Sequence, residues 1–532
     1  MKKLVFGLAL VFSVIPCQAR IITVDDNGPA DFNNIQAAIN DSWDGDRIEV
    51  RTGTYYENVY FYGKAITLTG TDPNDPNIVA QTIIDGNRAD SVVTFAWGEG
   101  PDSVINGFTI TNGKAPYGGG IYCWSASSPT ITNCVITNNV ASGEIGTARC
   151  GAGIYGGLPT IIHCSISGNS AVGFSYGGGL AYCNGYISAC VITNNTVDGD
   201  GGGLYQCYAT IQKCLIANNY AGGEWHGRAG GAGLYACNGQ IIECTISGNR
   251  SSNKGGGLNS CNGTKKNCVI VGNMALEYGG GLYNCKGRIE NCVISSNLVR
   301  DLGGGIYNDD YGGSPLIKNN IIYSNTGGGI YWKYTQPLEF SCCDAWNNAG
   351  GDYTGWAMAG KGCISNDPCF INPGYWVDIS NPNVVIGPNE ASCWYDQGFQ
   401  TNVIWTDKKT DYHLKSEAGR WDPNQSIWVY DVNTSTCIDA GDPNSDWTAE
   451  LWPHGKRINM GAYGGTPQAS MSLSDVGNIA DLNNDGLVDY VDLMLFTYQW
   501  STQQFLLSED LNRNGKVDFS DFAIFADNWL WP

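Results

Sequence analysis

The sequence predicts an all-β protein built as a solenoid, in which one short unit is stacked many times along an axis. A Gly-Gly-Gly or Gly-Ala-Gly triplet followed by Ile or Leu recurs nine times, at intervals of 24 to 33 residues. A second motif, led by Cys or Asn and ending in Asn, runs in phase with it. Fixed periods of this length are typical of units that bury their apolar faces only against their neighbours. The triplets begin at Gly118, Gly151, Gly177, Gly201, Gly231, Gly255, Gly279, Gly303 and Gly327.

Each unit is predicted to consist of short strands. In the second motif the position two after the leading residue is always Ile, whereas the residue between them varies, so Ile is expected to face inward. A coil of about 24 residues at about 3.3 Å per residue suits three strands and three turns, which describes a parallel β-helix. The last position is Asn in all eight copies, and we expect these side chains to stack in one column and to bond the backbone of the next coil. They are Asn139, Asn169, Asn195, Asn219, Asn249, Asn273, Asn297 and Asn325.

The segment before the repeats completes this pattern. It contains the stretches ADFNNIQAAIND, DRIEVRTGTYYENVYF and KAITLTG. Asn33 and Gln36 predict a capping box for a short helix that buries Ile35, Ala38 and Ile39. Together with the repeats, residues 22–335 resemble the right-handed parallel β-helix, or pectin-lyase-like, superfamily. The resemblance implies a right-handed solenoid whose open first coil is covered by that helix.

Residues 1–19 are predicted to be a secretory signal peptide. Lys2 and Lys3 precede the apolar run LVFGLALVFSVI, and a small-residue cleavage site Cys-Gln-Ala follows it. We therefore expect a secreted protein, extracellular or held on a cell surface, and no later stretch is apolar enough for a transmembrane segment. The formal net charge of −21 disfavours nucleic acid and anionic membranes as partners.

The 21 cysteines leave two interpretations open. Thirteen of them fall on two repeat positions, where they would stack inside the solenoid as free thiols. Export would instead favour one disulfide per coil, since several pairs lie seven residues apart, as in Cys183 and Cys190. No paired Cys-x-x-Cys motif with a neighbouring His is present, so a zinc site is not predicted.

The regular period ends near residue 336, where tryptophan becomes frequent. Ten of the seventeen tryptophans lie between Trp332 and Trp452. They either pack an irregular cover over the last coils or stack on sugar rings, and their usual burial favours the cover. The stretches ISNDPCFINP, DYHLK, CIDAGDP and RINMGAYGG resemble the closing segment of exported bacterial β-helix proteins.

Two twelve-residue loops near the C-terminus predict calcium sites. Both place oxygen-bearing residues at positions 1, 3, 5, 9 and 12, a glycine at position 6 and a backbone carbonyl at position 7. Aspartate at position 12 and a spacing of 29 residues resemble dockerin modules, which implies a cohesin-like protein partner. Tyr490-Val491 and Phe519-Ser520, where dockerins carry recognition residues, do not match each other. The predicted ligands are Asp481, Asn483, Asp485, Leu487, Asp489, Asp492, Asp510, Asn512, Asn514, Lys516, Asp518 and Asp521.

The longer repeats carry insertions at one turn, and this rim is the predicted catalytic edge. Arg149 lies in one insertion, and Trp225, His226 and Arg228 lie in another. Arginine suits a carboxylate bidentately and histidine is a base near neutral pH, so Arg149, His226 and Arg228 are candidate catalytic residues for a uronate. A solvated turn edge is the alternative explanation. Asp309-Asp310 resembles the paired carboxylates of β-helix glycosidases, but without their accompanying motifs.

Two functional classes follow from these observations. One is an exported protein that binds or processes extracellular polysaccharide as a lyase, epimerase or hydrolase, with the dockerin-like module as its attachment. The other is a non-catalytic surface or adhesion protein, because the repeats also resemble those of polymorphic outer-membrane proteins. The predicted organisation is a signal peptide (1–19), a cap with the first coils (20–115), regular repeats (116–335), a Trp-rich irregular part (336–469), a linker (470–478) and a calcium-binding domain (479–532).

Overall fold

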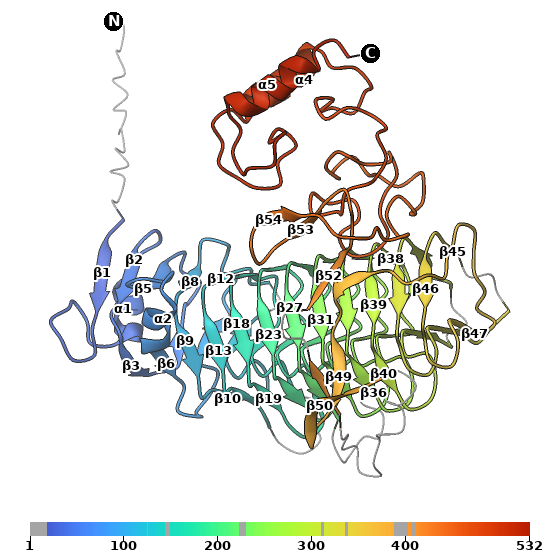
Figure 1. The fold of residues 1–532 in the computed structure, drawn as a ribbon. Helices are drawn as coiled ribbons and strands as arrows, with labels where there is room; N and C mark the ends of the chain where they lie inside the picture. The colour runs from blue at the N-terminus through green and yellow to red at the C-terminus, as the bar shows by residue number, and fades with distance from the viewer. Residues whose placement is uncertain are drawn as a thin grey trace, which may run out of the picture.

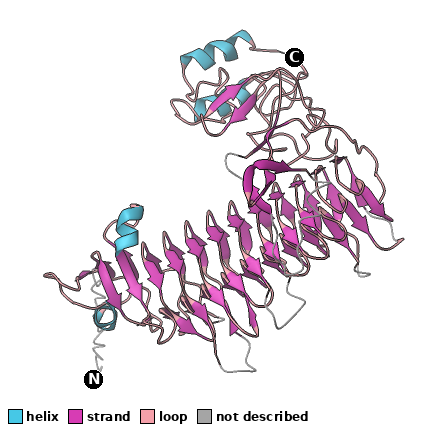
Figure 2. Cartoon of the chain, turned by 60° about the horizontal axis from the view of Figure 1, so that its bottom comes forward, coloured by secondary structure: helices cyan, strands magenta, loops and turns pink. Residues whose placement is uncertain are grey.

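The computed structural model describes residues 19–124, 126–143, 149–222, 230–309, 313–335, 339–387, 403–406 and 410–531. Its main body is a right-handed parallel β-helix, as predicted (Figure 1). Neighbouring strands in the sheets of the solenoid are parallel and come from successive coils, as β13 and β18 do. Figure 2 shows that the helices of the described residues lie at the N-terminal end and in the C-terminal module.

Three long sheets form the body of the solenoid, and from β2 onward each coil contributes one strand to each. Sheet A contains β1 (Ile21–Val24), β2 (Arg47–Val50), β5 (Thr67–Gly70), β8 (Val104–Asn106), β12 (Thr130–Thr132), β17 (Thr160–Ile162), β22 (Tyr186–Ser188), β26 (Thr210–Gln212), β30 (Ile241–Ile242), β34 (Lys265–Lys266), β38 (Arg288–Glu290), β42 (Leu316–Lys318) and β45 (Glu339–Ser341). Sheet B contains β3 (Gly53–Tyr56), β6 (Thr82–Asp85), β9 (Thr109–Thr111), β13 (Val135–Thr137), β18 (Ser165–Ser167), β23 (Val191–Thr193), β27 (Leu215–Ala217), β31 (Thr245–Ser247), β35 (Val269–Val271), β39 (Val293–Ser295), β43 (Ile321–Tyr323) and β46 (Asp344–Trp346). Sheet C contains β4 (Val59–Tyr60), β7 (Val93–Phe95), β11 (Ile121–Cys123), β16 (Ile154–Tyr155), β21 (Leu180–Ala181), β25 (Leu204–Tyr205), β29 (Leu234–Tyr235), β33 (Leu258–Asn259), β37 (Leu282–Tyr283), β41 (Ile306–Asn308), β44 (Ile330–Trp332) and β47 (Tyr353–Gly355).

A shorter fourth sheet lies between sheets B and C in the chain. Sheet D contains β10 (Lys114–Ala115), β14 (Val140–Ala141), β19 (Ser170–Ala171), β24 (Thr196–Val197), β28 (Tyr220–Ala221), β32 (Arg250–Ser251), β36 (Met274–Ala275) and β40 (Leu298–Val299). A further pair, β15 (Arg149–Cys150) and β20 (Ser175–Tyr176), joins two of the longer coils.

The predicted N-terminal helix is present as α1 (Ile35–Asp41). Its N-cap is Asn34, whose side chain accepts the N–H of Ala37, so the predicted capping role of Asn33 is wrong by one residue. Gln36 reaches the backbone of Tyr60 instead of closing a capping box. The face predicted to be buried is buried, and it covers the first coil. A second helix, α2 (Pro76–Gln81), was not predicted; it is capped by Asp75.

The predicted asparagine column is confirmed. In each coil the Asn Nδ2 donates to the Oδ1 of the next Asn and to an Ile carbonyl of the preceding coil, as Asn219 does to Asn249 and Ile192. All eight predicted asparagines are fully buried, as are the eight isoleucines of the second motif. The column continues to Asn348, which accepts the side-chain N–H of Asn325.

Both cysteine positions point into the solenoid, and every cysteine among the described residues is a free thiol. Several thiols lie within hydrogen-bonding distance of a carbonyl oxygen of the preceding coil: Cys183 Sγ is 3.8 Å from that of Ile154, and Cys190 Sγ is 3.5 Å from that of Ile161. Burial raises the pKa of the Cys123 thiol, which keeps it protonated. The structure therefore favours stacked thiols over one disulfide per coil.

The solenoid extends one coil beyond the predicted end at residue 335. Strands β45, β46 and β47 form this coil, in which Gly350-Gly351 stands for the glycine triplet and Ala345 for the inward Ile. Beyond it, an irregular segment, here called the lid (residues 357–472), packs along the outer side of sheet B over the last coils. Its strands are β48 (Phe370–Asn372), β49 (Tyr375–Asp378), β50 (Asn381–Ile386), β51 (Val403–Thr406), β52 (Asp411–Leu414), β53 (Arg420–Asp422) and β54 (Ile427–Val429).

Polar bonds and tryptophans hold the lid to the solenoid. Asn267 Nδ2 donates to the carbonyls of Ala462 and Gly464, at 2.8 Å each. Trp376 is 5% exposed, and its indole N–H donates to the Ser296 carbonyl. The interpretation of these tryptophans mainly as packing residues therefore fits the structure, although Trp356 is 60% exposed.

The C-terminal module contains α4 (Tyr490–Tyr498) and α5 (Phe519–Asp527). Phe496 and Phe525 are buried between them and lie with ring centroids 5.4 Å apart. The first residues of the predicted linker belong to the lid, since Ser470 Oγ donates to the Leu414 carbonyl and Met471 N to that of Gly419. Within the described ranges, no helix has the length and apolar character needed to cross a bilayer.

Candidate functional site

A column of tyrosines runs along the outer surface of sheet C. In each coil the inward Ile or Leu that follows the glycine triplet is succeeded by an outward residue, and these outward residues pair in register from coil to coil. The resulting stack, here called the tyrosine face, has parallel rings about one coil apart: the Tyr205 and Tyr235 centroids are separated by 5.5 Å, and those of Tyr307 and Tyr331 by 4.8 Å. The column consists of Tyr122, Tyr155, Ala181, Tyr205, Tyr235, Asn259, Tyr283, Tyr307 and Tyr331.

A second column at the preceding turn reinforces this face. Tyr176 stacks on Tyr205 at 4.7 Å, and Tyr278 stacks on Tyr307 at 4.6 Å. Because the rings cover one another, Tyr205 and Tyr307 are only 7% and 5% exposed. The face therefore presents ring edges and hydroxyl groups along most of its length, while flat ring faces are covered.

Charged groups lie among these tyrosines. Asp200 accepts the Gly230 N–H at 2.8 Å, and burial raises the pKa of its carboxyl to about 6. Asp309 accepts bonds from the Tyr283 hydroxyl and from Asn284 Nδ2. Lys254 Nζ donates to the Tyr283 hydroxyl at 3.2 Å. This arrangement places one carboxylate of near-neutral pKa beside aromatic hydroxyls, which is chemistry suited to a general base.

Of the three predicted catalytic residues, the structure describes only Arg149. Arg149 is 7% exposed, and its guanidinium donates to the carbonyls of Val172 and Gly143, so it holds the turn of its own insertion. His226 and Arg228, with Trp225, lie outside the described residues. Gly230, which follows that insertion, is the residue that donates to Asp200. Substrate contact by the three predicted residues stays a prediction, as does the carboxylate pair, since Asp310 is also outside the described ranges.

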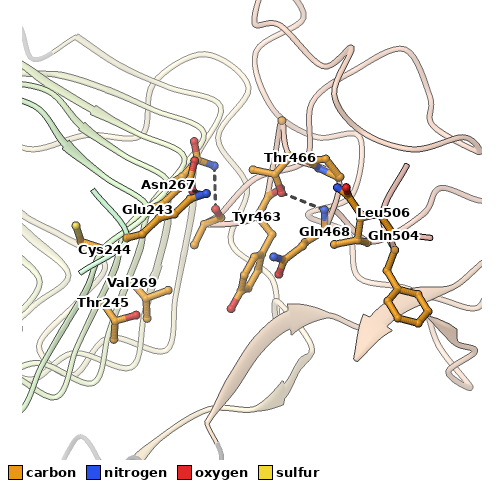
Figure 3. Close-up of a pocket in the computed structure, with 15 residues that line it drawn as sticks. Glu243, Cys244, Thr245, Asn267, Val269, Tyr463, Thr466, Gln468, Gln504 and Leu506 are labelled. Carbon is orange, nitrogen blue, oxygen red and sulfur yellow. Dashed lines mark hydrogen bonds and ion pairs between the residues drawn. The ribbon is translucent and has the colours of Figure 1, made fainter. Parts of the chain in front are cut away.

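A cleft of about 670 Å³ lies where the solenoid, the lid and the C-terminal module meet (Figure 3). Sheets A and B supply one wall, and Tyr463, Gln468 and the loop around Phe505 supply the other. Among the described lining residues only Lys213 and Glu243 are charged, and their charges are paired at 3.6 Å. The cleft therefore offers no unpaired charge for catalysis, and it marks the junction of the three parts.

The two predicted calcium loops have the same internal geometry. Asp481 accepts the N–H groups of Asp485 and Gly486, and Asp510 accepts those of Asn514 and Gly515. The position-12 carboxylates are fully buried and turn back into their loops. Asp492 bonds the backbone of Leu482, Asn483 and Asp489, and Asp521 bonds that of Asn512 and Asp518.

These loops fit calcium by the chemistry of their donors. Burial, together with the Asp492 carboxylate, raises the pKa of Asp481, because like charges have been gathered out of water. Within the described ranges no three His, Cys, Asp or Glu side chains form a metal-binding group by themselves. A bound ion would therefore also need the oxygens of Asn483 and of the Leu487 carbonyl. Such an all-oxygen set suits a hard cation such as calcium, which would offset the carboxylate repulsion.

The outer surface of the module is apolar. Along α4, Tyr490, Met494 and Tyr498 are 73%, 60% and 85% exposed and follow the helical spacing of one stripe. Phe519, at the equivalent first position of α5, is 77% exposed. The opposite side contacts the lid, where Arg513 of the second loop donates to the Trp452 carbonyl at 3.0 Å.

Sequence reasoning missed the tyrosine face, although a signal for it exists. In seven of the nine repeats the residue after the triplet's Ile or Leu is Tyr, as in GIYC at 120–123 and GLYN at 281–284. The sequence gives no motif that singles out Asp200. What distinguishes it is its burial beside Tyr176 and Tyr205, and that depends on the register between coils.

Comparison with known proteins adds little to this picture. A family model described as disaggregatase related matches residues 399–441, a part of the lid. No curated protein matches the chain. A solved structure described as the crystal structure of pectate lyase Pel9A is similar with a TM-score of 0.39 and 16% sequence identity, over 83% of this chain and 96% of that chain. The function proposed below therefore rests on the geometry and chemistry of the tyrosine face.

Proposed function

We propose that this protein is an exported β-helix protein that binds neutral extracellular polysaccharide on its tyrosine face and is attached to a larger assembly through a calcium-binding module. The observation that carries the proposal is the straight column of tyrosines on sheet C. Its partly exposed tyrosines, such as Tyr155, Tyr235 and Tyr331, recur at the spacing of the coils. Aromatic surface with regularly placed polar groups suits a hydroxyl-rich, repetitive ligand.

The charge distribution favours a neutral glycan over a polyuronate. The chain carries a net charge of −21, and among the described residues of the tyrosine face Asp200 and Asp309 accompany Lys254. A polyanion would meet repulsion from these carboxylates. The uronate chemistry predicted for the rim therefore has less support than binding of neutral polysaccharide.

Removing hydroxyls from the face should weaken glycan binding without disturbing the stack. Tyr155→Phe, Tyr235→Phe and Tyr331→Phe together delete the hydroxyls of three partly exposed tyrosines, each worth about 1 kcal/mol in a hydrogen bond, so we expect affinity to fall about tenfold or more. The measurement is binding to a glycan array followed by calorimetry on the best ligand. Tyr186→Phe, on the outer side of sheet A, is the matched control and should leave affinity unchanged. A wild-type protein that binds no glycan would overturn the proposal and favour the adhesion alternative.

Asp200 supports a second candidate function, a catalytic one. A carboxylate must be ionised to act as a base, so any turnover that depends on Asp200 should rise with pH through about 6. Asp200→Asn should remove this rise and lower kcat by about a hundredfold or more, with KM little changed. The measurement is a pH profile of product release from the glycan bound best. Absence of turnover, or a profile identical in Asp200→Asn, would leave binding as the function.

The attachment part of the proposal rests on the outer stripe of the module. This stripe consists of the exposed side chains of Tyr490, Met494, Tyr498 and Phe519. An exposed apolar patch of this kind is typical of a surface that binds another protein. A cohesin-like protein is the partner that the loop pattern implies. The stripe lies on the helices, and the calcium loops that contact the lid leave it free for such a partner.

A further inference from the structure

The tyrosine face is interrupted at two positions, and the interruptions differ. The first is Ala181, where the following residue, Tyr182, fills the missing position. The Tyr182 ring contacts Tyr155 and Tyr205 edge-on, with centroids 5.7 and 5.5 Å away. The second is Asn259, whose following residue is Ser260, and a serine is too small to do the same. The backbone is equivalent at both places, since Tyr182 and Ser260 both adopt φ near +55°.

The second interruption leaves a pocket of about 470 Å³ between Tyr235 and Tyr283. This pocket, here called the open rung, is lined by Tyr235, Lys254, Asn259, Ser260, Glu277 and Tyr283. Its two tyrosines lie two coils apart, which is about 10 Å at about 4.8 Å per coil. No tyrosine covers the rings of Tyr235 and Tyr283 on this side, but Tyr283 is only 8% exposed and the Lys254 ammonium lies over its ring. The pocket is therefore a slot with one open aromatic wall, Tyr235.

The floor and rim of the open rung are fixed by polar contacts. Asn259 Nδ2 donates to the Lys254 carbonyl at 3.3 Å, and its Oδ1 accepts the Ser260 hydroxyl at 2.8 Å. These bonds turn the amide down against the backbone and keep it out of the slot. The Lys254 ammonium lies over the Tyr283 ring, 5.0 Å from its centroid, and forms the second wall of the slot, while Glu277 also lines the pocket. One donor group and one acceptor group thus face the aromatic wall of Tyr235.

We propose that the open rung is a subsite that takes one neutral hexopyranose ring of the bound glycan, an inference that rests on the proposed polysaccharide function. The ring lies parallel to Tyr235, and its C–H groups meet the electron-rich face of that tyrosine. The pocket of about 470 Å³ accommodates one such ring between Tyr235 and the Lys254 side chain. Lys254 donates to one sugar hydroxyl and Glu277 accepts from another. Because the pocket carries one charge of each sign, Lys254 and Glu277, it favours a neutral sugar over a uronate.

Completing the column should close the subsite. Asn259→Tyr puts a ring in register between Tyr235 and Tyr283, so we expect at least about tenfold weaker binding of glucose and mannose hexasaccharides, measured by calorimetry. The thermal midpoint should be unchanged or higher, because the new ring stacks as its neighbours do. Ser260→Tyr, which copies the arrangement at Tyr182, is the second variant and should have the same effect. Thr210→Tyr, which adds a tyrosine beside Tyr186 on sheet A, is the control and should leave the affinity for the hexasaccharides unchanged.

The outcomes separate this inference from the function on which it rests. If wild type binds the hexasaccharides and both filled variants bind them equally well, the open rung is not the subsite, while the tyrosine face can still be the binding surface. If wild type binds no glycan, the proposed function itself fails. Tighter binding of galacturonate hexasaccharide than of the neutral ones, with loss in Lys254→Met, would overturn the assignment of a neutral sugar.

Discussion

Asn219→Ala is expected to lower the free energy of unfolding of the β-helix by about 3 kcal/mol or more. Asn219 Nδ2 donates to the Ile192 carbonyl and to Asn249, and its Oδ1 accepts the backbone and side-chain N–H groups of Asn195. The substitution leaves these partners buried without water. An unsatisfied buried group costs about 1 to 3 kcal/mol, and several are created at once.

The measurement is chemical denaturation followed by circular dichroism. Thr210→Ala is the matched control, since it truncates a half-exposed outward residue of the same coil and should change the free energy of unfolding by less than about 0.5 kcal/mol. An Asn219→Ala protein as stable as the control would mean that the column contributes packing alone.

Asp481→Ala combined with Asp510→Ala is expected to abolish the stabilisation of the C-terminal module by calcium. At a calcium concentration a hundredfold above the dissociation constant, each site contributes about 2.7 kcal/mol to the folded state. Without the ion, the carboxylates of Asp485 and Asp492 in the first loop, and those of Asp518 and Asp521 in the second, repel one another in a partly buried space. The helices α4 and α5 should then exchange their amide hydrogens rapidly even when calcium is present.

Hydrogen exchange of the full chain, with calcium and after chelation, measures this directly. Wild type should show protection of residues 490–498 and 519–527 that chelation removes, while the β-helix remains protected. Asp475→Ala, an exposed aspartate before the module, is the matched control and should respond as wild type does. Calcium-dependent protection that persists in the double variant would contradict the assignment of these loops.

The parts of the fold that the sequence predicts are those written in local or periodic patterns. The calcium loops are contiguous, so their donors can be recognised without knowing any tertiary contact. The asparagine column and the inward isoleucines recur at a fixed position in every coil, and stacking follows from the period alone. Even the start of α1 was misplaced by only one residue, because Asn33 and Asn34 are equally good caps and only the backbone decides between them.

The remaining features depend on contacts that no period encodes. The bond from Asn267 to Ala462 joins residues 195 positions apart, so the lid could not be placed against sheet B in advance. The tyrosine face depends on register, since Tyr155 and Tyr205 belong to alternate coils separated by Ala181. The last coil was not predicted because Ala345 stands in place of the inward Ile, and only two glycines, Gly350 and Gly351, stand in place of the triplet.

The alternation of inward and outward residues within each strand divides the chain into two sets that can change independently. Leu258 and Asn259 are adjacent in β33, yet Leu258 is buried in the apolar interior while Asn259 belongs to the outer column. Substitutions at the outer positions can therefore accumulate without loss of the scaffold. A single exchange of tyrosine for a small residue at another coil would open a new slot, at a distance from the first set by a whole number of coils. Such a surface can acquire new ligand preferences in evolution one coil at a time.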